Sequence, residues 1–203
     1  MKKIVYLLSA CVLGLGLTFT SCEMENEDEN GNNNNNNNGG GDQTSDAALP
    51  FTVDLTYTSG SQTAKASLDI SSLTAVSASQ GDLTLCWQNN YGYVMTSPNG
   101  NLIKQLYDAN TAPYSNTKST TVQNLGSVSL DNYDELSELN SLSVSSGSIP
   151  DLAGKNQVQV QSGDVIAFQK GSVKGVAKVS GLSKVTKKIT LKGYVNSSSS
   201  STK

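Results

Sequence analysis

The residue types that most enzymes use for acid–base and nucleophilic chemistry are scarce in this chain of 203 residues. It has no histidine and no arginine, and its 14 basic residues are all lysine. Without an imidazole there is no Ser-His-Asp triad and no histidine-ligated zinc. Ser115 and Lys118 have the S-x-x-K spacing of penicillin-binding enzymes, but so do Ser200 and Lys203, and the companion motifs are absent. We therefore expect no enzymatic activity.

Aromatic side chains offer a second kind of chemistry, the binding of a ligand by stacking. Five of them lie between residues 87 and 114: Trp87, Tyr91, Tyr93, Tyr107 and Tyr114. Sugar rings stack on exposed Trp and Tyr faces, so Trp87, Tyr91 and Tyr93 form a candidate ligand platform. The chain has only three Phe, however, and its core needs other large residues. Buried rings would make this group a core cluster, and exposed rings would make it a site.

The first 21 residues have the features of a secretory signal peptide. Lys2 and Lys3 precede an apolar stretch, 4–19, that is too short to span a bilayer comfortably. The small residues that end in Thr20-Ser21-Cys22 resemble the lipobox of bacterial lipoproteins, and Phe19 at its aliphatic position is common in those of Bacteroidetes. The resemblance implies cleavage before Cys22 and a lipid anchor on that cysteine. A plain secretory cleavage that leaves Cys22 free is the alternative.

Residues 22–46 are expected to tether that anchor to a folded domain. Glu23–Glu29 contains five acids; in the lipoproteins that it resembles, such a run looks like the signal for export to the outer face of the outer membrane. A solvated spacer is the alternative. Residues 32–38 are all Asn and 39–41 all Gly, and this composition cannot bury enough apolar surface to become ordered. The same argument predicts a disordered tail at 197–203.

The cysteines support no disulfide framework and no thiolate metal cluster. Cys11 leaves with the leader and Cys22 would carry lipid, so Cys86 stands alone. Its neighbours Leu85 and Trp87 predict a small buried hydrophobe rather than a nucleophile. We expect neither a cofactor nor a metal.

Charge is unevenly distributed along the chain. The net charge of −3 and the lack of arginine argue against a nucleic-acid partner, because phosphate binding needs a basic face. Residues 155–192 contain eight Lys and one acid, Asp164, whereas residues 42–154 contain eleven acids and three Lys. Complementary solvated strand faces within one domain would explain this pattern. A polyanion site on the C-terminal third is the alternative.

Residues 47–196 are predicted to form one β-rich domain, an antiparallel sandwich or small barrel with one or two short helices; an α+β fold is the alternative. Residues 51–58 alternate apolar and polar side chains with a period of two, as a half-buried strand does. Residues 64–70 would return beside this strand. Residues 83–87 and 91–96 would form a hairpin around the turn residues between them.

The sequence of the last third of the domain predicts an antiparallel meander with Val and Ile on one face and Lys on the other. Its expected strands are 158–160, 164–169, 173–180 and 187–195, separated by glycines.

Two segments are predicted to be helical. Asp131–Leu139 begins with acids and places leucines three residues apart, which favours a short capped helix. Its carboxylates fit one exposed helical face better than a glycosidase pair. Asn101–Ala109 has helical spacing of its apolar residues, although 97–100 could instead be a hairpin turn that leads into a strand.

A second resemblance concerns the C-terminal segment. GDVIAF at 163–168, KGVAKV at 174–179 and KITL at 188–191 resemble the closing segment of a group of uncharacterised Bacteroidetes lipoproteins. The resemblance implies a β-rich domain and no known activity, so it assigns no catalytic residues. The chain departs from that group at 171–173, where a longer Gly-Lys turn would be expected.

Two functions of different kinds follow from these features. The first is a non-enzymatic surface module that binds a glycan or another envelope protein. The second is a structural or assembly subunit whose exposed β edges add to a partner's sheet. The exposure of Trp87, Tyr91 and Tyr93 in the folded protein bears directly on the first.

Overall fold

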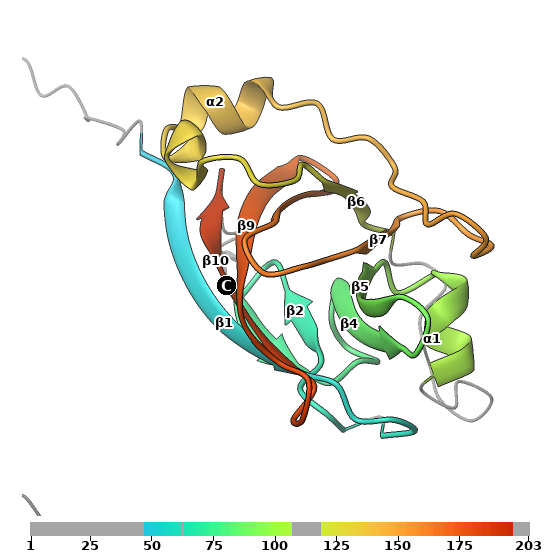
Figure 1. The fold of residues 1–203 in the computed structure, drawn as a ribbon. Helices are drawn as coiled ribbons and strands as arrows, with labels where there is room; N and C mark the ends of the chain where they lie inside the picture. Colours follow the sequence, from blue (N-terminus) through green and yellow to red (C-terminus); the bar gives the residue numbers. More distant parts are fainter. Residues whose placement is uncertain (1–46, 62, 107–118, 197–203) are drawn as a thin grey trace, which may run out of the picture. The chain divides into compact units, whose positions relative to one another are not determined.

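The computed structural model describes residues 47–61, 63–106 and 119–196, which form two antiparallel five-stranded sheets (Figure 1). The first sheet contains β1 (Leu49–Thr56), β6 (Thr121–Asn124), β8 (Val165–Lys170), β9 (Val173–Ser183) and β10 (Lys188–Val195). The second contains β2 (Ser67–Asp69), β3 (Thr74–Val76), β4 (Leu83–Gln88), β5 (Gly92–Thr96) and β7 (Gln157–Gln159). The helical pieces are short: α1 (Asn101–Leu106), the 3-10 turn η1 (Leu130–Tyr133) and α2 (Leu136–Ser141). This architecture confirms the predicted mainly-β sandwich with short helices.

Several predicted features lie outside the described residues. They are the leader, Cys22, the tether, Tyr107, Tyr114, the Ser115–Lys118 pair and the tail.

The first sheet has the strand order β1-β10-β9-β8-β6, and the second has the order β3-β2-β4-β5-β7. The alternation expected in 51–58 is confirmed in β1, where Phe51, Val53 and Leu55 are at most 7% exposed and face the core. The β4–β5 hairpin is also confirmed, as is the β8-β9-β10 meander. In β10, Ile189 and Leu191 are buried, whereas Lys192 on the other face is exposed.

Two predicted pairings are wrong. The segment after β1 was expected to return beside it, but β2 pairs with β3 and β4 in the second sheet, where Leu68 is fully buried. The segment 158–160 was expected to open the meander, but β7 pairs with β5 in the second sheet. In both cases the chain passes from the first sheet to the second. There β2 pairs with the two strands that follow it, whereas β7 pairs with β5, which is distant in sequence.

The predicted helix at Asp131–Leu139 is divided into η1 and α2. Glu135 between them is extended (φ −100°, ψ 145°) because it forms a β-bridge with Ala47, and the carbonyl of Asp134 accepts a hydrogen bond from the Ala48 N–H (2.8 Å). Pairing with the chain before β1 therefore interrupts the helix. The helix predicted at Asn101–Ala109 is confirmed over the described residues, as α1.

Two hydrophobic clusters stabilise the fold. The main core lies between the sheets, and Cys86 is fully buried in it, as predicted; burial raises the pKa of its thiol. A smaller cluster covers the outer face of the first sheet, where α2 lies over β9 (Figure 1). Its buried members are Ala48, Leu139, Val165, Ala167 and Val176.

The sheets are also joined by an ion pair between Lys170 on β8 and Asp82 just before β4. The Nζ–Oδ1 distance is 2.8 Å, and Asp82 is 1% exposed. Its other carboxylate oxygen accepts a hydrogen bond from the Ile70 N–H (3.1 Å).

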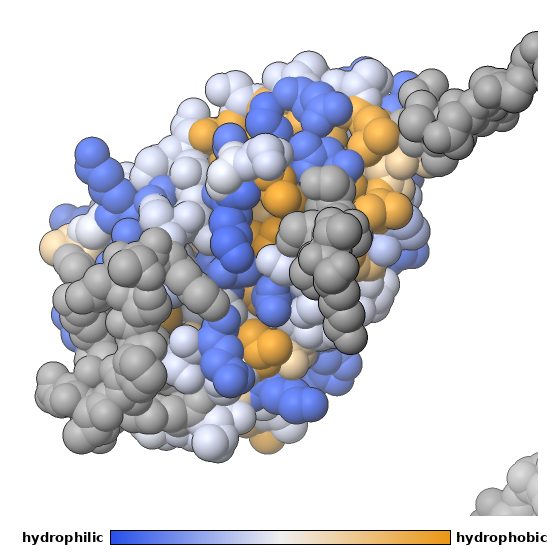
Figure 2. All heavy atoms as spheres, turned by 180° about the vertical axis from the view of Figure 1, so that it is seen from behind, coloured by the Kyte–Doolittle hydropathy of each residue, from blue (hydrophilic) through white to orange (hydrophobic). Residues whose placement is uncertain are grey.

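Most of the described surface is polar. Figure 2 shows hydrophobic side chains reaching one face in small groups between hydrophilic ones. Among the described residues, the large hydrophobic side chains that are exposed are Leu49 (42%) and Val185 (93%). No helix in the described ranges is long and apolar enough to cross a membrane.

Candidate functional site

Trp87 and Tyr93 lie opposite each other on β4 and β5, so both side chains project from the same face of the hairpin. Their ring centroids are 4.8 Å apart and their planes are inclined at 79°, an edge-to-face contact. The Tyr93 hydroxyl donates a hydrogen bond to the carbonyl of Ser183 on β9 (2.5 Å). The pair therefore lies where the β4–β5 hairpin meets the end of β9 in the other sheet.

The three predicted platform residues are close together but differ in burial. Tyr93 is 3% exposed and belongs to the main core, and burial raises the pKa of its hydroxyl. Trp87 and Tyr91 are half-buried and pack against the core while keeping part of their surface open. The group therefore combines a buried support, Tyr93, with two accessible rings.

Lys187 reaches this group from the β9–β10 turn. Its ammonium lies 3.3 Å from the centroid of a Trp87 ring, in a cation–π contact. Its carbonyl accepts a hydrogen bond from the Tyr57 N–H at the end of β1 (2.9 Å). Its φ of +52° is a left-handed conformation that favours Gly or Asn over other residues.

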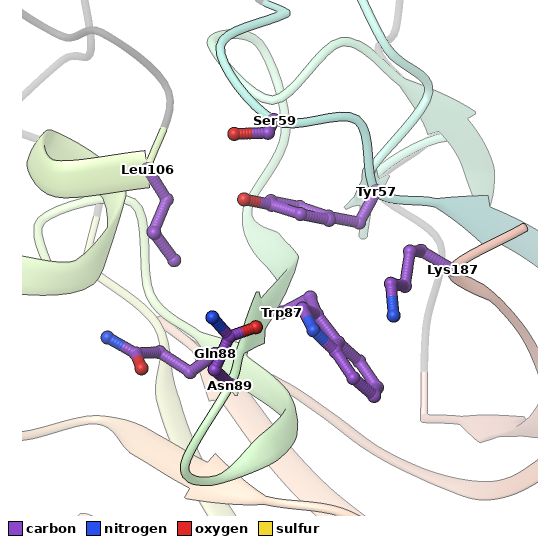
Figure 3. Close-up of a pocket in the computed structure, with 7 residues that line it drawn as sticks. All are labelled: Tyr57, Ser59, Trp87, Gln88, Asn89, Leu106 and Lys187. Atoms are coloured by element: carbon purple, nitrogen blue, oxygen red, sulfur yellow. The ribbon is translucent and has the colours of Figure 1, made fainter. Parts of the chain in front are cut away.

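A first hollow of about 510 Å³ opens on one side of Trp87 (Figure 3). Figure 3 shows Tyr57 and Ser59 along one wall and the amides of Gln88 and Asn89 on the opposite side. Leu106 of α1 and Lys187 also line it. Burial raises the pKa of the Tyr57 hydroxyl, and a hydrogen bond with Ser59 offsets part of that effect.

A second hollow of about 620 Å³ adjoins the first, and Trp87 and Asn89 line both. Its other residues come from the β4–β5 turn, from the segment after β7 and from the end of β9: Asn90, Tyr91, Gly92, Tyr93, Gln159, Val160, Gln161, Ser162, Leu182 and Lys184. Both volumes fall in the range of small-molecule sites, about 300–1,000 Å³. Trp87 is therefore the wall between two neighbouring openings.

The lining offers hydrogen bonds and positive charge. Amides, hydroxyls and two ammonium groups face the hollows, and none of the described residues that line them is a carboxylate. The amides and hydroxyls both donate and accept hydrogen bonds. Such a surface suits a ligand rich in hydroxyl groups.

Three of the other C-terminal lysines have side-chain partners within the domain. Lys188 pairs with Asp54 (2.6 Å) and Lys170 pairs with Asp82. Lys174 donates hydrogen bonds to the carbonyls of Asn140 and Leu142 at the end of α2, each at 2.7 Å. Lys184 and Lys187 have no carboxylate partner among the described residues, and they are the two lysines that line the hollows beside Trp87.

A metal site is not evident in the described ranges, where no three His, Cys, Asp or Glu side chains gather around a common point. Comparisons with protein-family models, curated proteins and solved structures found no match to this chain.

Sequence reasoning missed several of the site residues. Tyr57, Lys184 and Lys187 come from segments distant from Trp87 in the sequence, and nothing local connects them. The amides of Gln88 and Asn89 were interpreted only as turn residues. The excess of lysine after residue 155 was the one signal that pointed to this end of the domain.

Proposed function

We propose that this chain is a non-enzymatic carbohydrate-binding module, anchored by lipid on Cys22 and displayed on the outer face of the outer membrane. The leader, the acidic run and the tether support the location, and the Trp87 site supports the binding role. Each part of the proposal has its own test.

The observation that carries the binding role is the position of Trp87. Its half-buried indole separates two hollows that are lined by amides and hydroxyls. Sugars combine apolar C–H faces, which stack on aromatic rings, with hydroxyls, which hydrogen-bond to amides. Lys187 covers one face of the indole, but its flexible side chain can move aside while the ammonium remains in the hollow.

The test is a glycan array probed with the full chain in a detergent that has no sugar headgroup. Trp87→Ala should lower the affinity for bound glycans by more than about tenfold, because it removes the stacking surface of both hollows. Trp87→Phe should keep part of the affinity. Tyr133→Ala is the matched control, since Tyr133 is a half-buried aromatic residue in a different hollow. No binding to any glycan, or equal losses in Trp87→Ala and Tyr133→Ala, would contradict the proposal.

The anchor is tested by mass spectrometry of the mature amino terminus. An acylated Cys22 supports the proposed location. An unmodified, leaderless protein released into the medium would contradict it.

A second candidate function is that of a structural or assembly subunit. It is favoured by β1, an eight-residue strand at the edge of its sheet with an exposed Leu49. Such an edge can add to a partner's sheet, although Pro50 removes one of its N–H donors. Crosslinking on intact cells should capture one dominant partner, and a monodisperse lipoprotein without crosslinks would argue against this role.

A further inference from the structure

The β9–β10 turn places one lysine in each of the two hollows beside Trp87. Lys184 lines the second hollow and Lys187 lines the first. The turn projects into solvent, as the 93% exposure of Val185 between them shows. A ligand that extends across Trp87 from one hollow to the other would meet both ammonium groups.

These two positive charges have no carboxylate partner in the part of the chain that the structure describes. Asp54, on the neighbouring end of β1, is held by Lys188 and by the Thr190 hydroxyl (2.5 Å). Asp54 lines neither hollow, and the described lining of the two hollows contains no carboxylate. Because Lys187 is half-buried, its charge is also less screened than that of a fully exposed lysine.

The backbone presets the position of Lys187. Its left-handed φ would suit Gly or Asn better, yet a lysine occupies the position and reaches Trp87. The hydrogen bond from the Tyr57 N–H fixes its main chain to the end of β1. The main chain of Lys187 is therefore fixed beside the first hollow, and its flexible side chain carries the ammonium over Trp87.

We infer that the Trp87 site binds acidic polysaccharides, whose sugars carry carboxylate or sulfate groups, and that Lys184 and Lys187 contact those anions. The inference rests on the proposed carbohydrate-binding function and narrows its ligand class. The amides and aromatic rings bind the sugar ring and its hydroxyls, and the two lysines select for negative charge.

Other polyanions fit this surface less well. An anionic lipid surface is bound by clusters of basic residues together with several inserted apolar side chains, and this turn exposes a single large one, Val185. A nucleic acid is bound through its phosphates, which favour the planar fork of arginine, and the chain has no arginine. The hollows and their amides favour the polysaccharide.

The experiment measures the affinity of the full chain, in a detergent without sugar headgroups, for three probes by titration calorimetry. The probes are a galacturonic acid hexamer, which carries carboxylates alone, a chondroitin sulfate hexamer, which carries carboxylates and sulfates, and the neutral cellohexaose. The double variant Lys184→Gln/Lys187→Asn should bind an acidic probe about tenfold more weakly. Asn is chosen at residue 187 because it tolerates the left-handed backbone.

The matched control is Lys178→Gln/Lys192→Gln. It removes the same charge from exposed positions that face each other on β9 and β10 and line neither hollow. This control should keep the affinity for acidic probes, and that affinity should fall with added salt in the unmodified chain. Both double variants should keep the unfolding temperature of the unmodified chain, so that a lost affinity is not a lost fold.

Several outcomes would overturn the inference. Tighter binding of cellohexaose than of either acidic probe, or equal losses in the two double variants, would overturn it while leaving glycan binding intact. The same holds if binding is stronger to anionic phosphatidylglycerol vesicles than to acidic probes. Binding to no glycan at all would overturn both this inference and the proposed function.

Discussion

β1 connects two hollows of opposite charge. Before its first residue, Ala47 bridges Glu135 beside a hollow of about 490 Å³ that is lined by Asp131, Asp134, Glu135 and Glu138, together with Asn132 and Tyr133. After its last residue, the Tyr57 N–H bonds to Lys187 at the Trp87 site. From Ala47 to Tyr57 the extended chain covers roughly 33 Å. The acidic hollow and the Trp87 site therefore lie at opposite ends of this strand, whose start lies beside α2 in Figure 1.

The two ends differ in what supports them. The Trp87 site is built from strand ends and turns that pack on the main core, and Tyr93 is buried beneath it. The acidic hollow is built from η1 and α2, which rest on the smaller cluster, and Leu139 is the one buried residue of α2. The hollows are similar in size but differ in their lining. The carboxylates of the acidic hollow are exposed to solvent, whereas the lysines of the Trp87 site line hollows that also contain aromatic rings.

The largest expected effect comes from disturbing the strands that both ends share. A methyl group added at Gly193 would overlap the backbone carbonyl of Val176 on β9. This strand carries Val176 in the smaller cluster and Ser183 at the Trp87 site. Gly193→Ala should lower the free energy of unfolding by more than about 4 kcal/mol. Urea denaturation measures this, with the exposed Lys192→Ala as control. An unchanged urea midpoint for Gly193→Ala would show that β9 and β10 can move apart without a loss of stability, which would contradict this prediction.

The second effect concerns the acidic end alone. Leu139→Ala opens a cavity beneath α2 and should lower the free energy of unfolding by about 3 kcal/mol. Glycan binding at the Trp87 site should persist below the lowered melting temperature, and Ser137→Ala on the exposed side of α2 should change neither property. If Leu139→Ala abolished binding in the folded protein, the two ends would not be independent.

A third effect separates the structural lysines from those of the site. Lys170→Met removes the ammonium that pairs with the buried Asp82 and should lower the free energy of unfolding by about 2 kcal/mol, less than for a fully buried pair because Lys170 is 34% exposed. Adding Asp82→Asn should restore part of the loss. Chemical denaturation of the single and double variants provides the measurement. A Lys170→Met variant as stable as the parent would rule out this role of the pair.

The smallest effect is that of Asp54 on β1. Hydrogen bonds from Lys188 and Thr190 lower the pKa of its carboxyl in the folded state, so its ionised form stabilises the fold. This contribution is present above the ordinary pKa, about 4, and is lost as the pH falls through the lower folded value. Asp54→Asn should therefore cost at most about 0.5 kcal/mol at pH 7, since the pair is exposed, and nothing in strong acid. Urea denaturation of both proteins across that pH range measures this difference in stability. A destabilisation by Asp54→Asn that grows in acid would contradict a lowered pKa for Asp54.

Local patterns predicted the elements well and their pairing less well. The alternation of β1, the β4–β5 hairpin and the β8-β9-β10 meander follow from neighbouring residues and short turns. The placement of β7 depends on a partner far away in sequence, and that of β2 on which sheet it joins, and alternation encodes neither. Strands β3 and β6, of three and four residues, were not predicted.

The same limit applies to the site. Its aromatic residues were predicted because Trp87, Tyr91 and Tyr93 lie close together in the sequence. Lys187 and Tyr57 are 100 and 30 residues away from Trp87 and reach it only because β1, β9 and β4 end in the same place. The break between η1 and α2 was equally invisible, since it depends on Ala47 pairing with Glu135.

Trp87 is the single tryptophan of the chain. Its intrinsic fluorescence therefore reports on one place, the wall between the two hollows, without any added label. A bound molecule that displaces the ammonium of Lys187 or excludes water from the indole would change the wavelength and intensity of that emission. The protein thus carries its own optical probe with which the proposed binding at this site can be followed.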